Sequence, residues 1–234
     1  MNNMSKSLHN GPAFRAVAFD MDGTLLNTLD DIADAMNTVL AERGLPVHPV
    51  EHYRNFVGDG VVKLAERSLP SSAREDQRIG DCARRFKEVY GQNWNRKTTL
   101  YPGIAGLLDS LAELGLKMGI LSNKPHAFTL EAAGFYLAPW NFAAILGQED
   151  HRPPKPDPAG PRAMSQALGM SLPEILFIGD SGVDMQTAVR SGMYPAGVLW
   201  GFRAAEELQA AGAKTLIEHP RAILDLLGTE RSPG

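Results

Sequence analysis

Four polar clusters in the sequence carry side chains suited to phosphoryl chemistry, and each follows an apolar run that predicts a β-strand. The clusters are Asp20-Met21-Asp22-Gly23-Thr24, Ser122-Asn123-Lys124-Pro125, Lys155-Pro156-Asp157-Pro158 and Gly179-Asp180-Ser181-Gly182-Val183-Asp184. Any one of them alone is more often a turn or a surface loop than a catalytic site. Four of them in one chain, each behind a strand, indicate a shared site.

The side chains in these clusters suit a metal-assisted reaction at phosphorus. The carboxylates of Asp20 and Asp180 are hard oxygen ligands of the kind that Mg²⁺ prefers. Asp22 reaches the same pocket if the chain turns just after it. Lys155 brings positive charge for phosphate oxygens, and Ser122 offers a hydroxyl donor. Because phosphoryl transfer needs mainly positioning and charge stabilisation, and an aspartate can attack phosphorus itself, we expect a magnesium-dependent phosphate-monoester hydrolase with an aspartyl-phosphate intermediate.

The elements that must position these clusters alternate along the chain. The strands are expected at Arg15–Phe19, Lys117–Leu121, Ala143–Leu146, Ile175–Ile178, Ala196–Leu199 and Thr215–Ile217. The helices are expected at Ile104–Leu114, His126–Ala133, Ala159–Leu168, Asp184–Ser191, Ala204–Ala211 and about Arg221–Leu227. Such alternation predicts an α/β fold, with a Rossmann-like core built on a parallel sheet. Ligands of these sheets bind beyond the carboxyl ends of the strands, where the clusters fall.

A helical block is inserted after the first strand. Apolar residues recur at helical spacing from Ile32 to Leu40, and further helices are expected at about 60–69 and 72–94. The block has no strand pattern. We therefore expect a small all-helical cap at residues 29–95 and an α/β catalytic core at residues 13–28 and 96–227.

Two groups of polar residues in this block resemble metal sites, and we interpret both otherwise. Asp30, Asp31 and Asp34 fall in the first turns of a helix, where carboxylates suit the helix dipole, so a solvated face is expected. His48 and His52 are four residues apart, but prolines at positions 46 and 49 predict a loop or a helix start there. A zinc site is not expected.

The motifs together resemble those of a known superfamily. Phe19-Asp20-Met21-Asp22-Gly23-Thr24-Leu25, with Ser122, Lys155 and Gly179-Asp180, is similar to the haloacid dehalogenase-type (HAD) hydrolases. The resemblance extends from about residue 14 to residue 227. The helical block resembles the small cap of the C1 group, and the chain is most similar to its phosphoglycolate phosphatase-like members. Val57-Gly58-Asp59-Gly60 and Val198-Leu199-Trp200-Gly201 add support.

The resemblance implies roles for the acidic residues. Asp20 would attack phosphorus and also ligate Mg²⁺. Asp22 would protonate the leaving oxygen, then activate water against the aspartyl phosphate, and give the metal its backbone carbonyl. Asp180 would complete the metal site. Asp184 would support that site from behind or through a water molecule.

The resemblance also implies which residues bind the substrate. Ser122 and Lys155 would hold the transferring phosphoryl group, with Asn123 beside them in the second motif. The loop Gly58-Asp59-Gly60 precedes a cap helix, and its N–H groups suit an anion or hydroxyl groups of the substrate. Lys63 and Arg67 lie four residues apart on that helix, and whether they contact the substrate is left open.

Several alternative activities share this fold. A dehalogenase needs no proton donor for a halide, so Asp22 argues against it. A phosphonate hydrolase requires a cap lysine, for which Lys63 is the one well-placed candidate. A phosphomutase usually has Glu-Asp where this chain has Gly179-Asp180. A binding module without activity would be expected to lack Asp20 or Lys155.

The cap restricts the substrate to a small phosphorylated metabolite, because a polymer cannot fit beneath a closing cap. Phosphoglycolate is the first candidate by resemblance. Asp59 would repel its carboxylate unless Lys63 or Arg67 intervenes, and Asp59 suits a hydroxylated sugar phosphate better. A sugar-phosphate phosphatase or phosphomutase is therefore the alternative.

Composition limits the partners and the compartment. The formal net charge is −4, so no general attraction to nucleic acid or to an anionic membrane is expected. The one cysteine, Cys82, can form no internal disulfide, which is typical of the cytoplasm. Met1–Pro12 is polar and is interpreted as a loose tail rather than a secretory signal, and Gly228–Gly234 as a frayed end. A monomer or a homodimer is expected.

Overall fold

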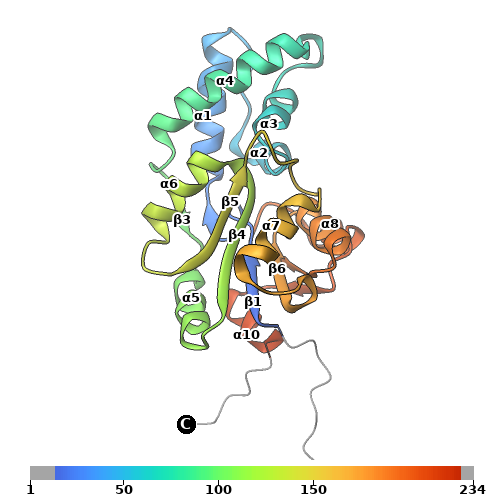
Figure 1. The fold of residues 1–234 in the computed structure, drawn as a ribbon. Helices are drawn as coiled ribbons and strands as arrows, with labels where there is room; N and C mark the ends of the chain where they lie inside the picture. Colours follow the sequence, from blue (N-terminus) through green and yellow to red (C-terminus); the bar gives the residue numbers. More distant parts are fainter. Residues whose placement is uncertain (1–13, 228–234) are drawn as a thin grey trace, which may run out of the picture.

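The computed structural model describes residues 14–227, so the interpretations of Met1–Pro12 and Gly228–Gly234 lie outside the described residues. The described chain has a twisted sheet flanked by helices, with a group of helices beyond the carboxyl ends of the strands (Figure 1). This is the α/β, Rossmann-like fold that the strand and helix pattern predicts. Within residues 14–227, no helix is both long and apolar enough to cross a membrane.

The main sheet is parallel throughout. Its strands, in spatial order, are β5 (Phe142–Gln148), β4 (Lys117–Pro125), β1 (Ala16–Phe19), β6 (Ile175–Gly179), β7 (Tyr194–Val198) and β8 (Thr215–Ile217). The first strand therefore lies between β4 and β6, and Phe19 pairs with Ile120 on one side and Ile178 on the other. Strands β1 and β6 end at the same level, whereas β4 continues to Pro125, so the cluster Ser122–Pro125, which was expected after this strand, forms its last four residues. The polar residues of the three strands still meet at one edge of the sheet.

Each face of the sheet is covered by its own helices. One face carries α5 (Ile104–Glu113), α6 (His126–Tyr136), the short helix η3 (Pro220–Ala222) and α10 (Ile223–Leu226). The other carries α7 (Ala159–Leu168), the short helix η2 (Leu172–Glu174) and α8 (Gly182–Ser191), and α9 (Ala205–Ala210) packs beside α8. Both faces of the sheet are buried, as the alternating side chains of β1 show. Val17 and Phe19 pack into the first core, and Ala16 and Ala18 pack into the second.

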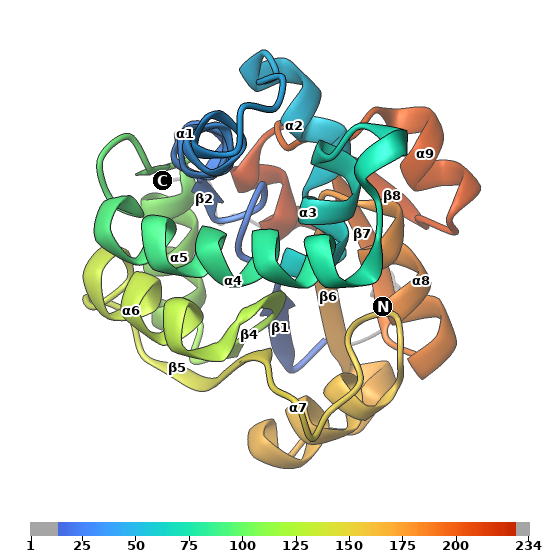
Figure 2. The same cartoon turned by 90° about the horizontal axis from the view of Figure 1, so that it is seen from above.

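The helices after β1 pack around a separate hydrophobic core. They are α1 (Leu29–Glu42), α2 (Val50–Phe56), α3 (Val61–Ser68), the short helix η1 (Ser71–Ala73) and α4 (Asp76–Asn93). Met36, Tyr53 and Phe86 lie in this core, together with Phe202 from the segment after β7. Figure 2 shows α3 and α4 lying across the edge of the sheet. We propose that these helices move as the cap, with boundaries at residues 29–95.

The structure differs from the predicted elements at several points. The segment around Pro49, expected to be a loop or a helix start, is a helix start: α2 begins at Val50, and the buried ring of Tyr53 anchors it. Two short strands, β2 (Leu26–Asn27) and β3 (Thr99–Leu100), form an antiparallel pair where the chain enters and leaves the cap. At two residues each, they are too short for a sequence period to reveal.

The solvated acidic face predicted for α1 is wrong for Asp31. Its side chain is buried and accepts hydrogen bonds from the backbone N–H of Lys97 (3.0 Å) and Thr98 (2.9 Å) and from Thr98 Oγ1 (2.7 Å). By contrast, Asp34 is half exposed and forms an ion pair with Lys97. Asp31 therefore fastens the start of the helical block to the segment through which the chain returns to the core.

Replacing Asp31 should destabilise this junction. The Asp31→Ala variant leaves buried N–H and hydroxyl donors without an acceptor, so the free energy of unfolding should fall by about 1–3 kcal/mol. Asp34→Ala removes an exposed carboxylate of the same helix and should change it by less than about 0.5 kcal/mol. Urea denaturation of both variants measures the difference, and equal losses would contradict the assigned role.

Candidate active site

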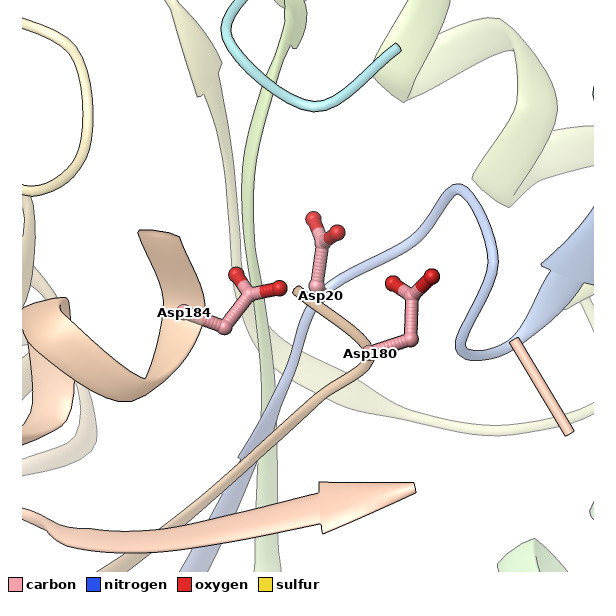
Figure 3. Close-up of side chains that lie close together, drawn as sticks. All are labelled: Asp20, Asp180 and Asp184. Atoms are coloured by element: carbon pink, nitrogen blue, oxygen red, sulfur yellow. The ribbon is translucent and has the colours of Figure 1, made fainter. Parts of the chain in front are cut away.

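Three buried carboxylates meet at the edge of the sheet. Asp20 follows β1, Asp180 follows β6 and Asp184 lies in the first turn of α8, and one oxygen from each lies within 4.8 Å of the others (Figure 3). They are 6%, 2% and 0% exposed. The parallel pairing of β1 with β6 brings the first two together. The third is fixed by the start of α8, where Ser181 and Asp184 form a reciprocal capping box.

Lys155 neutralises part of this cluster. Its Nζ lies 2.9 Å from Asp20 Oδ1 and 2.6 Å from Asp184 Oδ1. Asn123 holds the lysine's backbone, because its Oδ1 accepts from Lys155 N–H (2.8 Å) and its Nδ2 donates to Lys155 O (3.2 Å). The same Nδ2 donates to Gly58 O (3.1 Å). Asn123 therefore links the lysine to the cap loop.

The pKa values reflect the excess of buried negative charge. Burial raises the pKa of Asp20 to about 6, the charges of Asp184 and Asp22 add to this, and Lys155 opposes it. Burial, followed by the charges of Asp184 and Asp20, raises the pKa of Asp180 well above its ordinary value. Although burial disfavours its charged form, the same carboxylates hold the pKa of Lys155 above its usual range, so it stays cationic.

The cluster fits a hard divalent cation. Three carboxylates face one lysine, and Asp20 Oδ1 accepts no well-aligned hydrogen bond despite its burial. An all-oxygen donor set of this kind suits Mg²⁺, whose charge would offset the excess.

Asp180 is held in a slot that two glycines leave open. Its carboxylate accepts from the N–H of Phe202 (2.7 Å) and from Thr24 Oγ1 (3.3 Å). A Cβ at Gly23, where φ is +87°, or at Gly201 would overlap this carboxylate. The turn at Gly23 within the first motif, which the sequence predicts just after Asp22, is thus shaped around Asp180.

Asp22 joins a second buried group that the sequence motifs do not predict. Lys124 Nζ lies 3.1 Å from Asp22 Oδ1 and 2.7 Å from the hydroxyl of Tyr90 on α4. Although burial opposes it, the negative charge of Asp22 raises the pKa of Lys124, which stays charged. In the sequence, the only indication of this buried group is the lysine inside the Ser122–Pro125 motif. The group connects the first motif, β4 and the cap helix α4.

A cavity of about 50 Å³ lies beside the carboxylates, between the core and the cap helices. Of the residues that the sequence predicts for the site, its wall contains Asp20, Asp22, Gly58, Gly60, Ser122, Asn123 and Asp180. The rest of the wall is largely apolar and includes Val57, Val61, Leu64, Phe86 and Phe202. Lys155 and Asp184 lie behind this wall, against Asp20.

The remaining predicted cap residues are engaged elsewhere. Asp59 is not among the cavity-lining residues of the described chain and forms an ion pair with Arg67 (2.6 Å). Lys63 is half exposed and pairs with Glu66 (2.6 Å), which does not support the Schiff-base lysine of a phosphonate hydrolase. His48 Nε2 contacts the carbonyl oxygen of Ser68 (2.7 Å), which does not support a zinc site with His52.

Comparison with known proteins identifies the family. The model of the haloacid dehalogenase-like hydrolases matches residues 17–198, most of the chain. The chain belongs to the haloacid dehalogenase-like hydrolase family. The expected HAD resemblance is thereby confirmed.

Relatives of this HAD hydrolase match it over nearly its whole length. It is 30% identical to a Pectobacterium atrosepticum protein named phosphoglycolate phosphatase, over 94% of this chain and 95% of that one. A Pseudomonas putida protein of the same name is also 30% identical, over 94% and 82%. Among solved structures, a Lactobacillus delbrueckii subsp. bulgaricus protein provisionally named a phosphoglycolate phosphatase superposes with a TM-score of 0.86, at 28% identity over 92% and 98%.

The raised pKa of Asp20 predicts a pH-dependent cost of folding in this HAD hydrolase. The native state binds a proton at Asp20 more tightly than the unfolded state does, so metal-free stability falls as pH rises from about 4 through about 6. Asp20→Asn removes this cost. In EDTA, the variant should be more stable than wild type by up to about 3 kcal/mol at pH 8, with the gain vanishing near pH 4.

Denaturant unfolding at several pH values measures this gain. Asp34→Asn, the same type of substitution at an exposed carboxylate outside the buried cluster, is the control. A gain for Asp20→Asn that is the same at pH 4.5 and pH 8, or a loss of stability at pH 8, would show that burial of this charge is not costly.

Proposed function

We propose that this HAD hydrolase is a magnesium-dependent phosphatase that hydrolyses a small phosphate monoester through an aspartyl phosphate on Asp20. The observation that carries the proposal is the buried cluster of Asp20, Asp180 and Asp184 with Lys155 against it, next to a cavity between the core and the cap helices. The relatives that match almost the whole chain and are named phosphoglycolate phosphatase support the same reaction class.

The chain's residues divide the first half of the reaction among them. A carboxylate oxygen of Asp20 attacks phosphorus, and the bond from phosphorus to the ester oxygen breaks. In this proposal Asp22 carries a proton in the substrate complex and gives it to the departing oxygen, which leaves as an alcohol. Ser122 donates its hydroxyl hydrogen to a phosphoryl oxygen, and Lys155 orients Asp20 and offsets phosphoryl charge.

The second half of the reaction releases phosphate. Asp22, now ionised, takes a proton from water, whose oxygen attacks the phosphorus of the aspartyl phosphate. The bond to Asp20 then breaks and the carboxylate is restored. Mg²⁺, held by Asp20, Asp180 and the backbone carbonyl of Asp22, would supply charge stabilisation between the nucleophile and the phosphoryl oxygens. Asp184 holds Lys155 in place through its 2.6 Å ion pair.

Phosphoglycolate is the substrate that we favour. The cavity is small, and the relatives carry that name. The conflict expected between Asp59 and a substrate carboxylate is removed, because Arg67 pairs with Asp59 outside the cavity wall. The main reason for preferring a sugar phosphate therefore no longer applies.

Replacing the nucleophile tests the proposal directly. Asp20→Asn should lower phosphoglycolate hydrolysis by about a thousandfold or more, because an amide neither attacks phosphorus nor ligates a metal well. Wild-type activity should also disappear in EDTA and return with added Mg²⁺. Phosphate release measures both effects. Turnover that survives exhaustive chelation, or persists in an Asp20→Asn preparation free of contaminating phosphatase, would refute the mechanism.

Replacing Asp22 should separate the two half-reactions. With p-nitrophenyl phosphate, whose leaving group needs no proton, Asp22→Asn should still transfer the phosphoryl group but fail to activate water. We expect a burst of about one p-nitrophenol per enzyme and a protein heavier by one phosphoryl group in intact mass spectrometry. With phosphoglycolate, the burst should be lost. Wild-type turnover of phosphoglycolate by Asp22→Asn would exclude the acid–base role.

A further inference from the structure

Arg203, one of the cavity-lining residues, has a donor nitrogen that makes no hydrogen bond among the described residues. It lies in the segment after β7, contacts the end of α2 and lines the cavity. Its Nη2 donates to the carbonyl oxygens of Val57 (2.9 Å) and Asn55 (3.5 Å), and its Nε donates to Glu207 (3.2 Å). The other nitrogen, Nη1, is buried and has no hydrogen-bond partner among the described residues.

An unpaired nitrogen of a guanidinium is costly when buried. A charged donor that loses water without gaining an acceptor gives up more free energy than a neutral one. The side chain of Arg203 is 10% exposed, so bulk water does not compensate. Because Arg203 belongs to the cavity wall, a ligand in the cavity is a natural source of the missing acceptor.

The other cations near the cavity are already paired. Lys124 contacts Asp22 and the hydroxyl of Tyr90. Lys155 contacts Asp20 and Asp184. Among the described residues around the cavity, Arg203 is therefore the cation with a nitrogen that is still free to donate. This nitrogen can bind the part of the substrate that is not transferred.

We propose that Arg203 is a specificity-determining residue that binds a carboxylate on the leaving group of the substrate. The inference rests on the proposed phosphatase function. It identifies the residue that binds the leaving group of the substrate. A guanidinium pairs well with a carboxylate, and the pairing fills the donor capacity of Nη1. It assigns to a core residue the recognition that the sequence suggested for the cap cations Lys63 and Arg67.

A purely structural role for Arg203 is the competing explanation, since its Nη2 also ties the cap loop to the core. Arg54 provides the matched comparison. It joins the same two parts from the other side, donating to Gly201 O (3.0 Å), and it is not among the cavity-lining residues of the described chain. A change that only loosens this junction should affect every substrate alike, whether or not the substrate has a carboxylate.

The test compares two substrates that differ in that group. Phosphoglycolate carries a carboxylate where ethyl phosphate carries a methyl group. Arg203→Met should lower kcat/KM for phosphoglycolate by about 10- to 100-fold, the range of a hydrogen bond to a charged group. Ethyl phosphate should change by less than about threefold. Arg54→Met should leave the ratio of the two substrates unchanged.

A binding measurement makes the result independent of turnover. Calorimetric titration of both esters into Asp20→Asn, with and without Arg203→Met, should show the same 10- to 100-fold selective loss of phosphoglycolate affinity. Equal losses for the two esters, in kinetics or in binding, would overturn the role of Arg203. Absence of turnover of either ester by the wild-type enzyme would overturn the proposed function instead, and the affinities would still decide the role of Arg203.

Discussion

The burial of three carboxylates against one lysine is the constraint on which the rest of the structure depends. Burial raises the pKa values of Asp20 and Asp180, so their ionised forms are costly without a compensating cation. The parallel pairing of β1 with β6 and the capping box of α8 supply rigid positions for these groups. The protein gives up stability at this edge of the sheet to keep a concentrated negative charge there.

The segment between β7 and α9 contacts each of the structural parts that surround these carboxylates. Trp200 Nε1 donates to Thr24 O (3.0 Å), in the loop of the first motif. Phe202 donates its N–H to Asp180 and places its ring in the core of the cap helices. Arg203 reaches the cap loop through the carbonyl oxygen of Val57. One short segment thus contacts the loop of the first motif, a carboxylate of the cluster and the cap helices.

The sequence predicts most of the sheet and the residues at its edge, because buried strands and the polar clusters behind them are local signals. What it misses depends on contacts between distant segments. Asp31 meets Thr98 across 67 positions, and Lys124 meets Asp22 across 102. Helix periodicity and dipole arguments describe one element at a time, so they place Asp31 in water. Pairing of a buried lysine is likewise invisible until the fold brings its partner to it.

Gly23 and Gly201 come from opposite ends of the chain and close around the same carboxylate. Apolar side chains elsewhere in the molecule can exchange for others of similar volume. At these two positions even a methyl group would take the space of Asp180. A library of random variants selected for retained activity should therefore return glycine at both, although neither glycine contributes an atom to the chemistry. Glycine would be required at both positions because the side chain of Asp180 occupies the space that any larger residue would need.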